Sequence, residues 1–431
     1  MQYTSSTVKL WALVDCNSFY CNCERLFKHK LRDKPVVVLS NNDGCLIALT
    51  PEAKALGFSM GEVYFQVADK LREHKISVFS SNYTLYADIS QRVMGTLKTV
   101  APHIDQYSID EAFVPFDAVL AAQPDEVGWE MHDRVAKWVG MPVRVGIGPT
   151  RTLAKLANHW AKKKTRVYRL EPGTPEFESI LESTPVGEVW GVGRRQAKKL
   201  LLQGIRNAKQ LRDMDLDKAL RLLTVVGQRT VYELRGFQCI MMDTAPMPRK
   251  TLVSSRSFGR RTRKKEELAE SLAMHASIAG QRLRMENMVA SALSIWCESS
   301  HHMEEEYFCI RGTVNLGLPT NITPDLIKAA HTALESCYRP NHGFMKGGIL
   351  LFGLAEEGNR QLTLMEAALP GSDAKRRALM RAMDKINDKY GRNTLHAAAQ
   401  GEADAPWRMR RHKMSPCYTT CLKDFPKVKT S

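Results

Sequence analysis

The chain has 431 residues, more than one hydrophobic core normally accommodates, so we expect several domains. Hydrophobic residues make up 44% and charged residues 25%, which is typical of folded proteins and excludes an intrinsically disordered chain. The 62 Lys and Arg residues outnumber the 46 Asp and Glu residues, and the formal net charge is +16. There is no run of about 18 apolar residues, and the polar N-terminus lacks the pattern of a signal peptide, so we expect a cytoplasmic protein.

The basic excess is concentrated in three segments without Asp or Glu, namely 151–169, 191–212 and 249–265. They carry 22 of the 62 basic residues, which leaves 40 basic against 46 acidic residues elsewhere. One such segment is commonly a solvated helix face. Here there are three such segments, and the rest of the chain is slightly acidic. This pattern favours binding of one polyanion, such as a nucleic-acid backbone, that several domains contact.

The ten Cys residues are scattered and form no paired C-x-x-C motif, which predicts reduced thiols. A zinc site can be drawn from Cys297, His301, His302 and Cys309. The acidic run that follows the two histidines favours a polar turn between strands instead.

Strands and helices alternate along the first 170 residues, which predicts an α/β or α+β domain. The apolar patterns predict strands at 10–15, 35–39, 105–113 and 143–148, and helices at 18–27, 51–56, 83–100 and 125–139. Short helices follow to about residue 236, and a linker rich in Pro and Met covers 244–248.

Beyond the linker, the pattern predicts a separate domain. Its expected elements are strand 251–258, helix 266–286, strand 289–298, strand 307–314, helix 324–337 and strand 348–355. This β-α-β-β-α-β order is a split βαβ unit. Residues from 356 onwards contain one helix near 374–389 and little aromatic core, so we expect a tail that is partly ordered at best.

Three acidic residues lie at the ends of apolar strands. Asp15 ends the first strand, and Asp110 and Glu111 are adjacent in the apolar run I-D-E-A-F. Alternation along a strand directs one of two adjacent carboxylates inward unless a turn or bulge intervenes. Burying carboxylates is costly, and Mg²⁺ binds through a few carboxylates, waters and phosphates. A helix N-cap at Asp15 and a strand-end turn at Asp110 and Glu111 explain the spacing equally well.

Three segments, in order, resemble the catalytic blocks of the Y-family, or lesion-bypass, DNA polymerases. They are L-V-D-C-N-S-F-Y-C-N-C-E at 13–24, S-I-D-E-A-F at 108–113 and V-G-I-G-P-T-R-T-L-A-K at 145–155. The segments V-V-V-L-S-N-N-D-G-C, A-K-A-L-G and the terminal S-P-C-Y-T-T are similar to the UmuC-like catalytic subunits of bacterial DNA polymerase V. The resemblance covers essentially the whole chain.

This resemblance implies an α+β multidomain fold shaped like a right hand. The expected parts are a palm at 8–28 and 83–170, fingers at 29–82, a helical thumb with a helix-hairpin-helix at 171–240, a linker at 241–250, a β-α-β-β-α-β little finger at 251–355 and a clamp- and partner-binding tail at 356–431. The implied activity is error-prone, template-directed DNA synthesis past damaged bases in the SOS response.

The resemblance also implies roles for the acidic residues. Asp15 and Asp110 would ligate two Mg²⁺ ions together with the backbone carbonyl of Cys16, and Glu111 would hold the ion that activates the primer 3′ hydroxyl. Tyr20 matches the steric gate, a ring that leaves no space for a 2′ hydroxyl. Without the resemblance, the residues alone favour reading Tyr20 as a packing aromatic.

Lys54 and Lys162 are the expected contacts of the incoming deoxynucleoside triphosphate. The chain departs here from many family members, because Pro51 stands where a phosphate-contacting Tyr is common and Lys54 where Arg is common. A Lys supplies a point charge without the bidentate fork of Arg, so we expect looser triphosphate geometry.

The segment that begins Gly191-Val-Gly193 resembles a helix-hairpin-helix, in which backbone N–H groups bind a DNA phosphate. Arg194 and Arg195 follow it directly, and a simple turn between helices is the alternative.

The segment S-S-R-S-F-G-R-R-T-R resembles the first strand of the little finger. Alternation would place Arg256, Phe258 and Arg260 on one face, where contacts to DNA would be mostly phosphate contacts.

Gln361, Leu362, Leu364 and Met365 resemble the pentapeptide that binds the sliding clamp, with Met365 where Phe is more usual. A chance amphipathic stretch is the alternative. The basic C-terminal end would bind the accessory processed UmuD-like dimer or DNA, and a recombinase filament is a further expected partner. We expect no membrane partner and a nucleoid-associated location in the cytoplasm.

Two other classes of protein remain open. A non-catalytic DNA-binding or clamp-tethered scaffold would keep the fold without needing Asp15, Asp110 and Glu111. A two-metal nuclease or cyclase on a similar palm would use these acids for hydrolysis or cyclisation.

Overall fold

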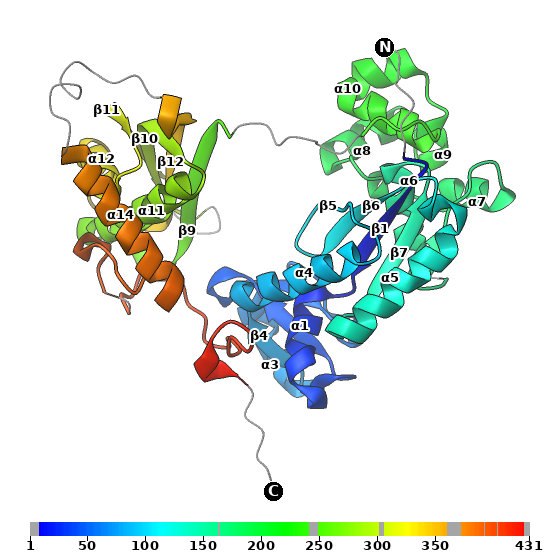
Figure 1. The fold of residues 1–431 in the computed structure, drawn as a ribbon, viewed down its shortest axis with the longest axis horizontal. Coiled ribbons are helices and arrows are strands. Elements are labelled where there is room, and N and C mark those ends of the chain that lie inside the picture. The colour runs from blue at the N-terminus through cyan, green and yellow to red at the C-terminus, as the bar shows by residue number, and fades with distance from the viewer. Residues whose placement is uncertain are drawn as a thin grey trace, which may run out of the picture. The chain divides into compact units, whose positions relative to one another are not determined.

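The computed structural model describes residues 8–162, 164–240, 249–300, 306–359, 372–391, 393–402 and 404–425. They belong to two compact units, drawn in Figure 1. Of the described residues, the first unit contains 8–40, 44–240 and 413–425, and the second contains 41–43 and 249–412. None of the described helices is both long enough and apolar enough to cross a membrane.

The first unit is built on a five-stranded sheet in the order β5-β6-β1-β7-β8. Its strands are β1 (Leu10–Cys16), β5 (Asp105–Gln106), β6 (Glu111–Phe116), β7 (Val143–Gly148) and β8 (Val167–Arg169). The central strand β1 pairs antiparallel with β6 and β7. Because it is buried on both faces, its sequence is an almost continuous apolar run.

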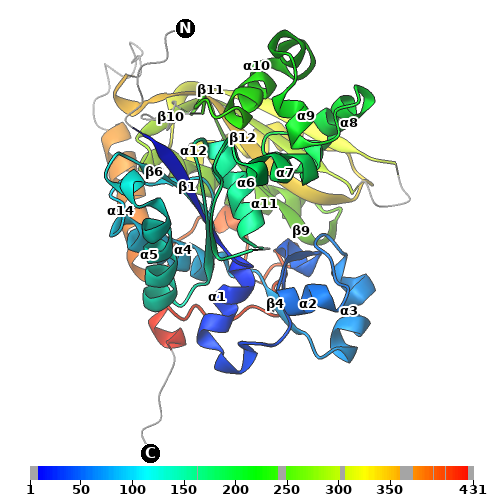
Figure 2. The same ribbon diagram turned by 90° about the vertical axis from the view of Figure 1, so that its right-hand side faces the viewer.

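Helices cover both faces of this sheet. Helices α4 (Tyr83–Lys98) and α5 (Pro124–Val139) lie on one side of β1, and α6 (Arg151–Ala161) lies on the other (Figure 2). A Cβ atom at Gly146 of β7 would lie 2.1 Å from the backbone nitrogen of Asn158, so only glycine permits α6 to pack this closely. This close packing brings the polar side chains of α6 to the end of β1.

The predicted strand 105–113 is wrong as a single strand. It is two strands, β5 and β6, separated by a turn in which the N–H groups of Tyr107 and Ser108 both donate to the Glu111 carbonyl at 3.1 Å. Asp110 therefore lies in the turn, whereas Glu111 begins β6. The turn removes the strict alternation that a continuous strand would impose on these two carboxylates.

A smaller sheet in the order β3-β2-β4 follows β1 in the chain. It contains β2 (Val36–Leu39), β3 (Leu46–Leu49) and β4 (Ser77–Ser80), and it is accompanied by α1 (Phe19–Phe27), α2 (Pro51–Ala55) and α3 (Tyr64–Glu73). Helix α2 begins at an N-cap, because the Thr50 side chain accepts the N–H of Ala53 and Pro51 occupies the first turn.

Four helices complete the described core of the first unit, as the short-helix pattern predicted. They are α7 (Pro175–Ser183), α8 (Arg194–Leu202), α9 (Ala208–Arg212) and α10 (Leu216–Leu234). The fully buried Glu233 of α10 accepts the backbone N–H groups of Thr152, Cys239 and Ile240 at 3.0, 2.7 and 3.1 Å. These charge-assisted hydrogen bonds join α10 to the first turn of α6.

The second unit has the predicted β-α-β-β-α-β order. Its elements are β9 (Thr251–Thr262), α11 (Lys265–Met285), β10 (Met288–Glu298), β11 (Cys309–Thr320), α12 (Thr323–Cys337) and β12 (Phe344–Glu356). The antiparallel sheet has the order β11-β10-β12-β9, and α11 and α12 contribute apolar side chains to one core with it.

Beyond residue 359, the structure describes 372–391, 393–402 and 404–425 of the tail that the sequence predicted to be partly ordered at best. Helix α14 (Ser372–Tyr390) is joined to α11 by Asp384, which accepts two hydrogen bonds from Arg284 at 2.7 and 2.9 Å. Trp407 lies in the core of the second unit, and its indole N–H donates to Glu270 at 2.8 Å. Residues 413–425 belong to the first unit. A few well-placed side chains were enough to anchor a segment that is poor in aromatic residues.

A buried histidine gives the stability of the second unit a pH dependence. His275 of α11 lies 2.9 Å from the Ser254 hydroxyl, and burial, with the positive charge of Arg256 second, lowers the pKa of His275 to about 3. Below pH 6.5 the unfolded chain binds a proton that the folded protein excludes, so stability falls as the pH decreases from 6.5 towards 3. Between pH 8 and pH 5 we expect this group to cost about 2 kcal/mol.

Urea unfolding at the two pH values measures this loss of stability. The variant His275→Asn should lose less stability on acidification, whereas His74→Asn, at an exposed histidine, should behave like the unmodified chain. Equal losses in the unmodified chain and in His275→Asn would contradict the prediction.

Candidate active site

Two cavities meet at the carboxyl end of β1, and Asp15 lines both. The larger, of about 610 Å³, is lined among others by Asp15, Cys16, Tyr20, Lys54, Asp110 and Lys162. The smaller, of about 430 Å³, is lined among others by Asp15, Glu111 and Lys155. The fold therefore collects six of the predicted site residues in one cavity and places Glu111 in the adjoining one.

The acidic residues are close enough to influence one another. Asp15 and Glu111 are partners in the β1–β6 register, and the Cys16 N–H donates to the Asp110 carbonyl at 2.9 Å. Burial raises the pKa of Asp15 most strongly, the neighbouring Arg144 opposes the rise, and Glu111 adds to it. The pKa of the buried Cys16 thiol is also raised, first by burial and then by the charges of all three carboxylates.

Two cations that the sequence analysis did not assign to the site compensate this negative charge. Arg144 of β7, the register partner of Asp15, donates from Nη2 to Asp15 Oδ1 at 2.6 Å. Lys155 of α6 donates from Nζ to both oxygens of Glu111 at 2.9 and 3.2 Å. Arg144 is the one charged residue in the strand V-R-V-G-I-G. This isolated charge is the sequence feature that could have assigned Arg144 to the site.

The donor set fits a hard divalent cation. Asp15, Asp110 and Glu111 offer only oxygen atoms, which is the ligand type that Mg²⁺ prefers. Across the described residues, no three His, Cys, Asp or Glu side chains are already gathered as a metal-binding group. Asp110 Oδ1 instead accepts the Ser108 hydroxyl at 2.6 Å. Asp15, Asp110 and Glu111 thus line the two cavities between them. Each of these carboxylates accepts a hydrogen bond from a protein side chain.

Aromatic side chains hold Tyr20 at the edge of the larger cavity. Tyr20 lies in the first turn of α1, and its ring is stacked on Tyr86 with a centroid distance of 4.7 Å and an interplanar angle of 21°. The Tyr83 ring meets it edge-on at 6.0 Å. Both supporting residues come from the first turn of α4. Lys54 and Lys162 lie on α2 and at the C-cap of α6, and Arg166, which was not predicted, lines the same cavity.

The predicted helix-hairpin-helix segment lies before α8. Gly191 has φ +90°, a conformation that favours glycine, and Gly193 is the N-cap of α8. Arg194 and Arg195 in the first turn are exposed. The local backbone is compatible with a phosphate-binding turn, and the contact with DNA stays a prediction.

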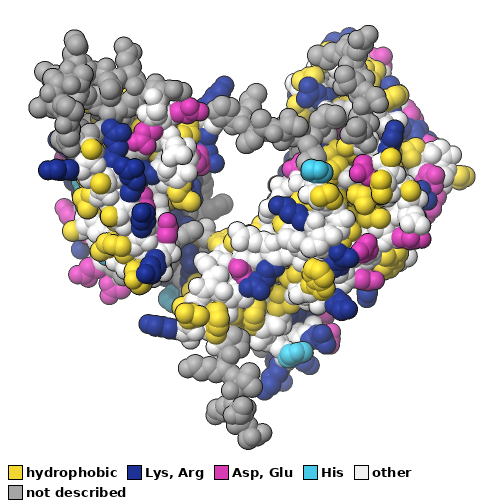
Figure 3. All heavy atoms as spheres, viewed as in Figure 1, with side chains coloured by type: hydrophobic (Ala, Val, Ile, Leu, Met, Phe, Trp, Pro, Cys, Tyr) yellow, Lys and Arg dark blue, Asp and Glu magenta, His cyan; other side chains and the backbone are white. Residues whose placement is uncertain are grey.

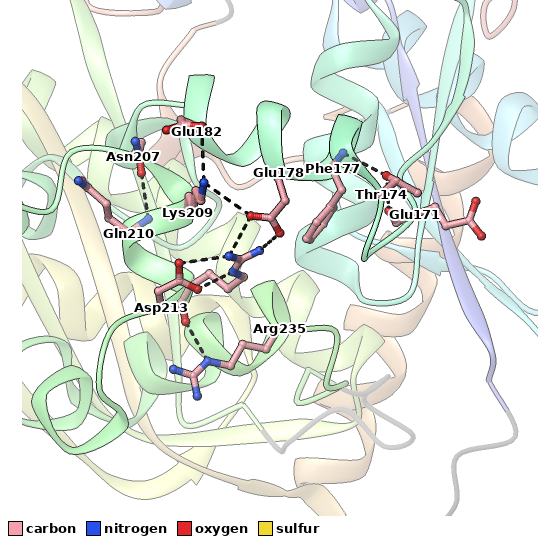
Figure 4. Close-up of polar contacts among 11 residues, drawn as sticks. Glu171, Thr174, Phe177, Glu178, Glu182, Asn207, Lys209, Gln210, Asp213 and Arg235 are labelled. Carbon is pink, nitrogen blue, oxygen red and sulfur yellow. Dashed lines mark hydrogen bonds and ion pairs between the residues drawn. The ribbon is translucent and has the colours of Figure 1, made fainter.

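Many charges in the three basic segments are already paired with acids from other elements. Arg151 forms an ion pair with Asp105 at 2.8 Å. Arg212 is held by Glu178 and by the adjacent Asp213, two acids that are labelled in the polar network of Figure 4. Figure 3 shows basic and acidic side chains interspersed on the visible face of the first unit. The absence of acids in a sequence segment therefore did not mean an absence of acids in space.

The two predicted arginines of β9 have different surroundings. Phe258 is buried in the core of the second unit, and Arg260 turns to Glu267 of α11 with a 2.6 Å ion pair. Arg256 is exposed, and its Nη1 lies 3.4 Å from the Met409 sulfur. The pairing register with β12 shifts after Ser257, so simple alternation does not continue to the end of the strand.

Two sequence predictions concern residues that lie outside those the structure describes. The clamp-binding candidates Gln361, Leu362, Leu364 and Met365 lie outside the described residues. So do His301 and His302 of the alternative zinc site. All ten cysteines are free thiols.

Comparison with known proteins identifies the family. Residues 14–159 match the impB/mucB/samB family, residues 249–364 match its C-terminal domain, and residues 377–428 match a domain of unknown function called DUF4113. The chain is 39% identical to the protein UmuC of Salmonella typhimurium LT2, over 97% of this chain and 100% of UmuC. It is 37% identical to the protein ImpB of Salmonella typhimurium, over 97% and 99% of the two chains.

A more distant relative and a solved structure also match most of the chain. DNA polymerase IV 1 of Bacillus subtilis is 26% identical over 90% of this chain and 92% of its own. The solved structure of a Y-family DNA polymerase chimera is similar in fold, with a TM-score of 0.61 and 17% identity, over 80% of this chain and 98% of the chimera. Fold and family together define a DNA polymerase of the lesion-bypass Y family. Within it, the chain belongs to the impB/mucB/samB family, as the resemblance predicted.

Proposed function

We propose that the protein extends DNA primers past damaged template bases with low fidelity, in the SOS response, by two-Mg²⁺ nucleotidyl transfer. The observation that carries this proposal is the position of Asp15, which lines two adjoining cavities with a different acidic partner in each. A displacement reaction at phosphorus needs charge compensation at both the attacking and the leaving oxygen. Two neighbouring carboxylate sites that share one acidic residue, Asp15, suit that requirement.

The proposed metal ligands are distributed over the two cavities. In the larger one, Asp15, Asp110 and the Cys16 carbonyl would hold the ion that accompanies the nucleotide, and in the smaller one Glu111 would hold the ion beside the primer end. When bound, the two ions would stabilise negative charge on the reacting oxygens. Lys54 and Lys162 would neutralise the triphosphate, and the Tyr20 ring would occupy the space that a 2′ hydroxyl needs.

We also propose a role for each part of the fold. The palm would comprise 8–28 and 83–170, the fingers 29–82, the thumb 171–240, the linker 241–250 and the little finger 251–355, with the clamp- and partner-binding tail at 356–431. Arg194, Arg195 and the exposed Arg256 would contact the backbone of the primer-template. The sliding clamp, a processed UmuD-like dimer and a recombinase filament are the proposed protein partners, in a bacterial cytoplasm at the nucleoid.

One assay on a labelled primer-template with Mg²⁺ and deoxynucleotides tests this function. The template should carry an abasic site, and the clamp, the accessory dimer and the recombinase filament should be omitted in turn. Products longer than the primer and extending past the lesion support the proposal. Shortened products would indicate a nuclease, cyclised nucleotides would indicate a cyclase, and binding without any product under the full set of proteins would favour the scaffold alternative.

A further inference from the structure

The segment 413–418, which we call the strap, packs against the rest of the first unit. The Ser80 N–H at the end of β4 donates to the Lys413 carbonyl at 3.0 Å, and the Lys413 N–H donates to the Ser80 hydroxyl at 2.9 Å. The Tyr418 ring is stacked on Phe27 of α1 with a centroid distance of 4.7 Å. Figure 1 shows this C-terminal part of the chain beside β4. The strap lies within the region that matches a domain of unknown function.

Ser415 is the centre of the contact between the strap and the rest of the first unit. Its hydroxyl donates to Glu24 Oε1 at 2.9 Å and accepts Asn82 Nδ2 at 3.1 Å. Asn82 Nδ2 is also 3.0 Å from the Ser415 carbonyl. Glu24, Asn82 and Ser415 are 0%, 1% and 3% exposed. Because a buried polar group that loses its partner is costly, this network strongly favours one arrangement.

The same network reaches the aromatic residues behind Tyr20. The Tyr86 hydroxyl donates to Glu24 Oε1, the oxygen that also accepts Ser415, at 2.8 Å. Asn82 is the N-cap of α4, because its Oδ1 accepts the Leu85 N–H at 3.2 Å. The strap therefore contacts both the cap of α4 and the acceptor that orients Tyr86, whose ring is stacked on Tyr20.

We propose that the strap is a positioning element for sugar selection. Through Ser415 it holds Glu24 and Tyr86 in place, so that a 2′ hydroxyl cannot displace the Tyr20 ring. The inference rests on the steric-gate role proposed above for Tyr20. A ring excludes an extra oxygen only if the groups behind it resist displacement, and a tightly packed contact transmits that resistance. Ser415, Glu24 and Tyr86 are thus positioning residues that do not touch the nucleotide.

The preference for deoxyribonucleotides over ribonucleotides is the measurement that separates positioning from general stability. It is the ratio of two kcat/KM values on one enzyme sample, so a loss of folded protein lowers both values and leaves the ratio unchanged. The assay uses the full chain with its accessory proteins and an undamaged primer-template. The variants are Ser415→Ala, which removes the strap hydroxyl, and Tyr86→Phe, which keeps the ring and removes its hydrogen bond to Glu24.

Both variants should lower the deoxyribonucleotide preference about three- to tenfold, mainly by admitting ribonucleotides, since each loses one buried hydrogen bond of the support. Thr420→Ala, which removes an exposed hydroxyl just beyond the strap, is the matched control and should leave the ratio unchanged. Tyr20→Ala should lower the ratio further than either variant. If Tyr20→Ala lowers the ratio while Ser415→Ala and Tyr86→Phe do not, the strap proposal is overturned. The steric-gate role of Tyr20 is then retained. If Tyr20→Ala leaves the ratio unchanged, the gate itself is overturned, and the strap's role with it.

Discussion

Asp110→Ala is expected to reduce primer extension by about a thousandfold or more, because charge stabilisation at a reacting phosphate is worth several kcal/mol and each 1.4 kcal/mol is a factor of ten in rate. Asp110 lines the larger cavity with Asp15 and lies in a turn, with one oxygen accepting the Ser108 hydroxyl. Removing its carboxylate leaves the sheet pairing of β6 in place, since β6 begins at Glu111. The loss should therefore appear in catalysis more than in stability.

Single-nucleotide incorporation on a primer-template, with accessory proteins present, measures this effect. Asp133→Ala is the matched control, because Asp133 is an exposed acid on α5. Ser108→Ala keeps the Asp110 carboxylate and removes its hydrogen bond, so we expect a much smaller loss than in Asp110→Ala. An Asp110→Ala protein that extends primers at the rate of the unmodified chain would contradict the catalytic assignment.

Tyr20→Ala is expected to raise ribonucleotide incorporation about 10- to 100-fold relative to deoxyribonucleotide incorporation. Forcing an additional group into a packed site costs about 1–3 kcal/mol, and removing the ring abolishes that cost. The stacked Tyr86 ring keeps Tyr20 from moving aside in the unmodified protein. The raised pKa of Tyr20, caused first by burial, means that the ring stays neutral at physiological pH.

The control for this prediction is Tyr20→Phe, which retains the ring and should retain the discrimination. Competition between a ribonucleotide and the matching deoxyribonucleotide, read from alkali-sensitive sites in the product, measures the ratio. If Tyr20→Ala discriminates as well as Tyr20→Phe, then another part of the cavity excludes the 2′ hydroxyl.

Local sequence patterns were sufficient for much of the architecture. The strands and helices from β9 to β12 occur in the predicted order, because alternation and helical periodicity are properties of neighbouring residues. The run 105–113 was the instructive failure: its apolar residues suit one strand, and the turn that divides it is formed by hydrogen bonds to the Glu111 carbonyl. The sequence left a turn at Asp110 and Glu111 open as an alternative, and only the hydrogen bonds of the folded chain decide between that turn and a continuous strand.

The candidate site was predictable in part. Asp15, Tyr20 and Asp110 belong to ordered motifs, and the fold brings them to one cavity. Arg144 and Lys155 were missed, because their significance depends on which acid they face across a sheet or from a helix. For the same reason, the sequence did not show which charges in the basic segments are compensated, such as Arg151 by Asp105 and Arg212 by Glu178.

By itself, the sequence determined the class of protein and the order of its elements, and it indicated the acids that we propose carry the chemistry, since all three depend on residue type and short spacing. Only the tertiary structure decided which charges are compensated and what lies behind Tyr20. Ser415 meets Glu24 across 391 positions of sequence, and no local pattern encodes that contact. It follows from burial, because a polar group removed from water must find its partner wherever the packed chain provides one.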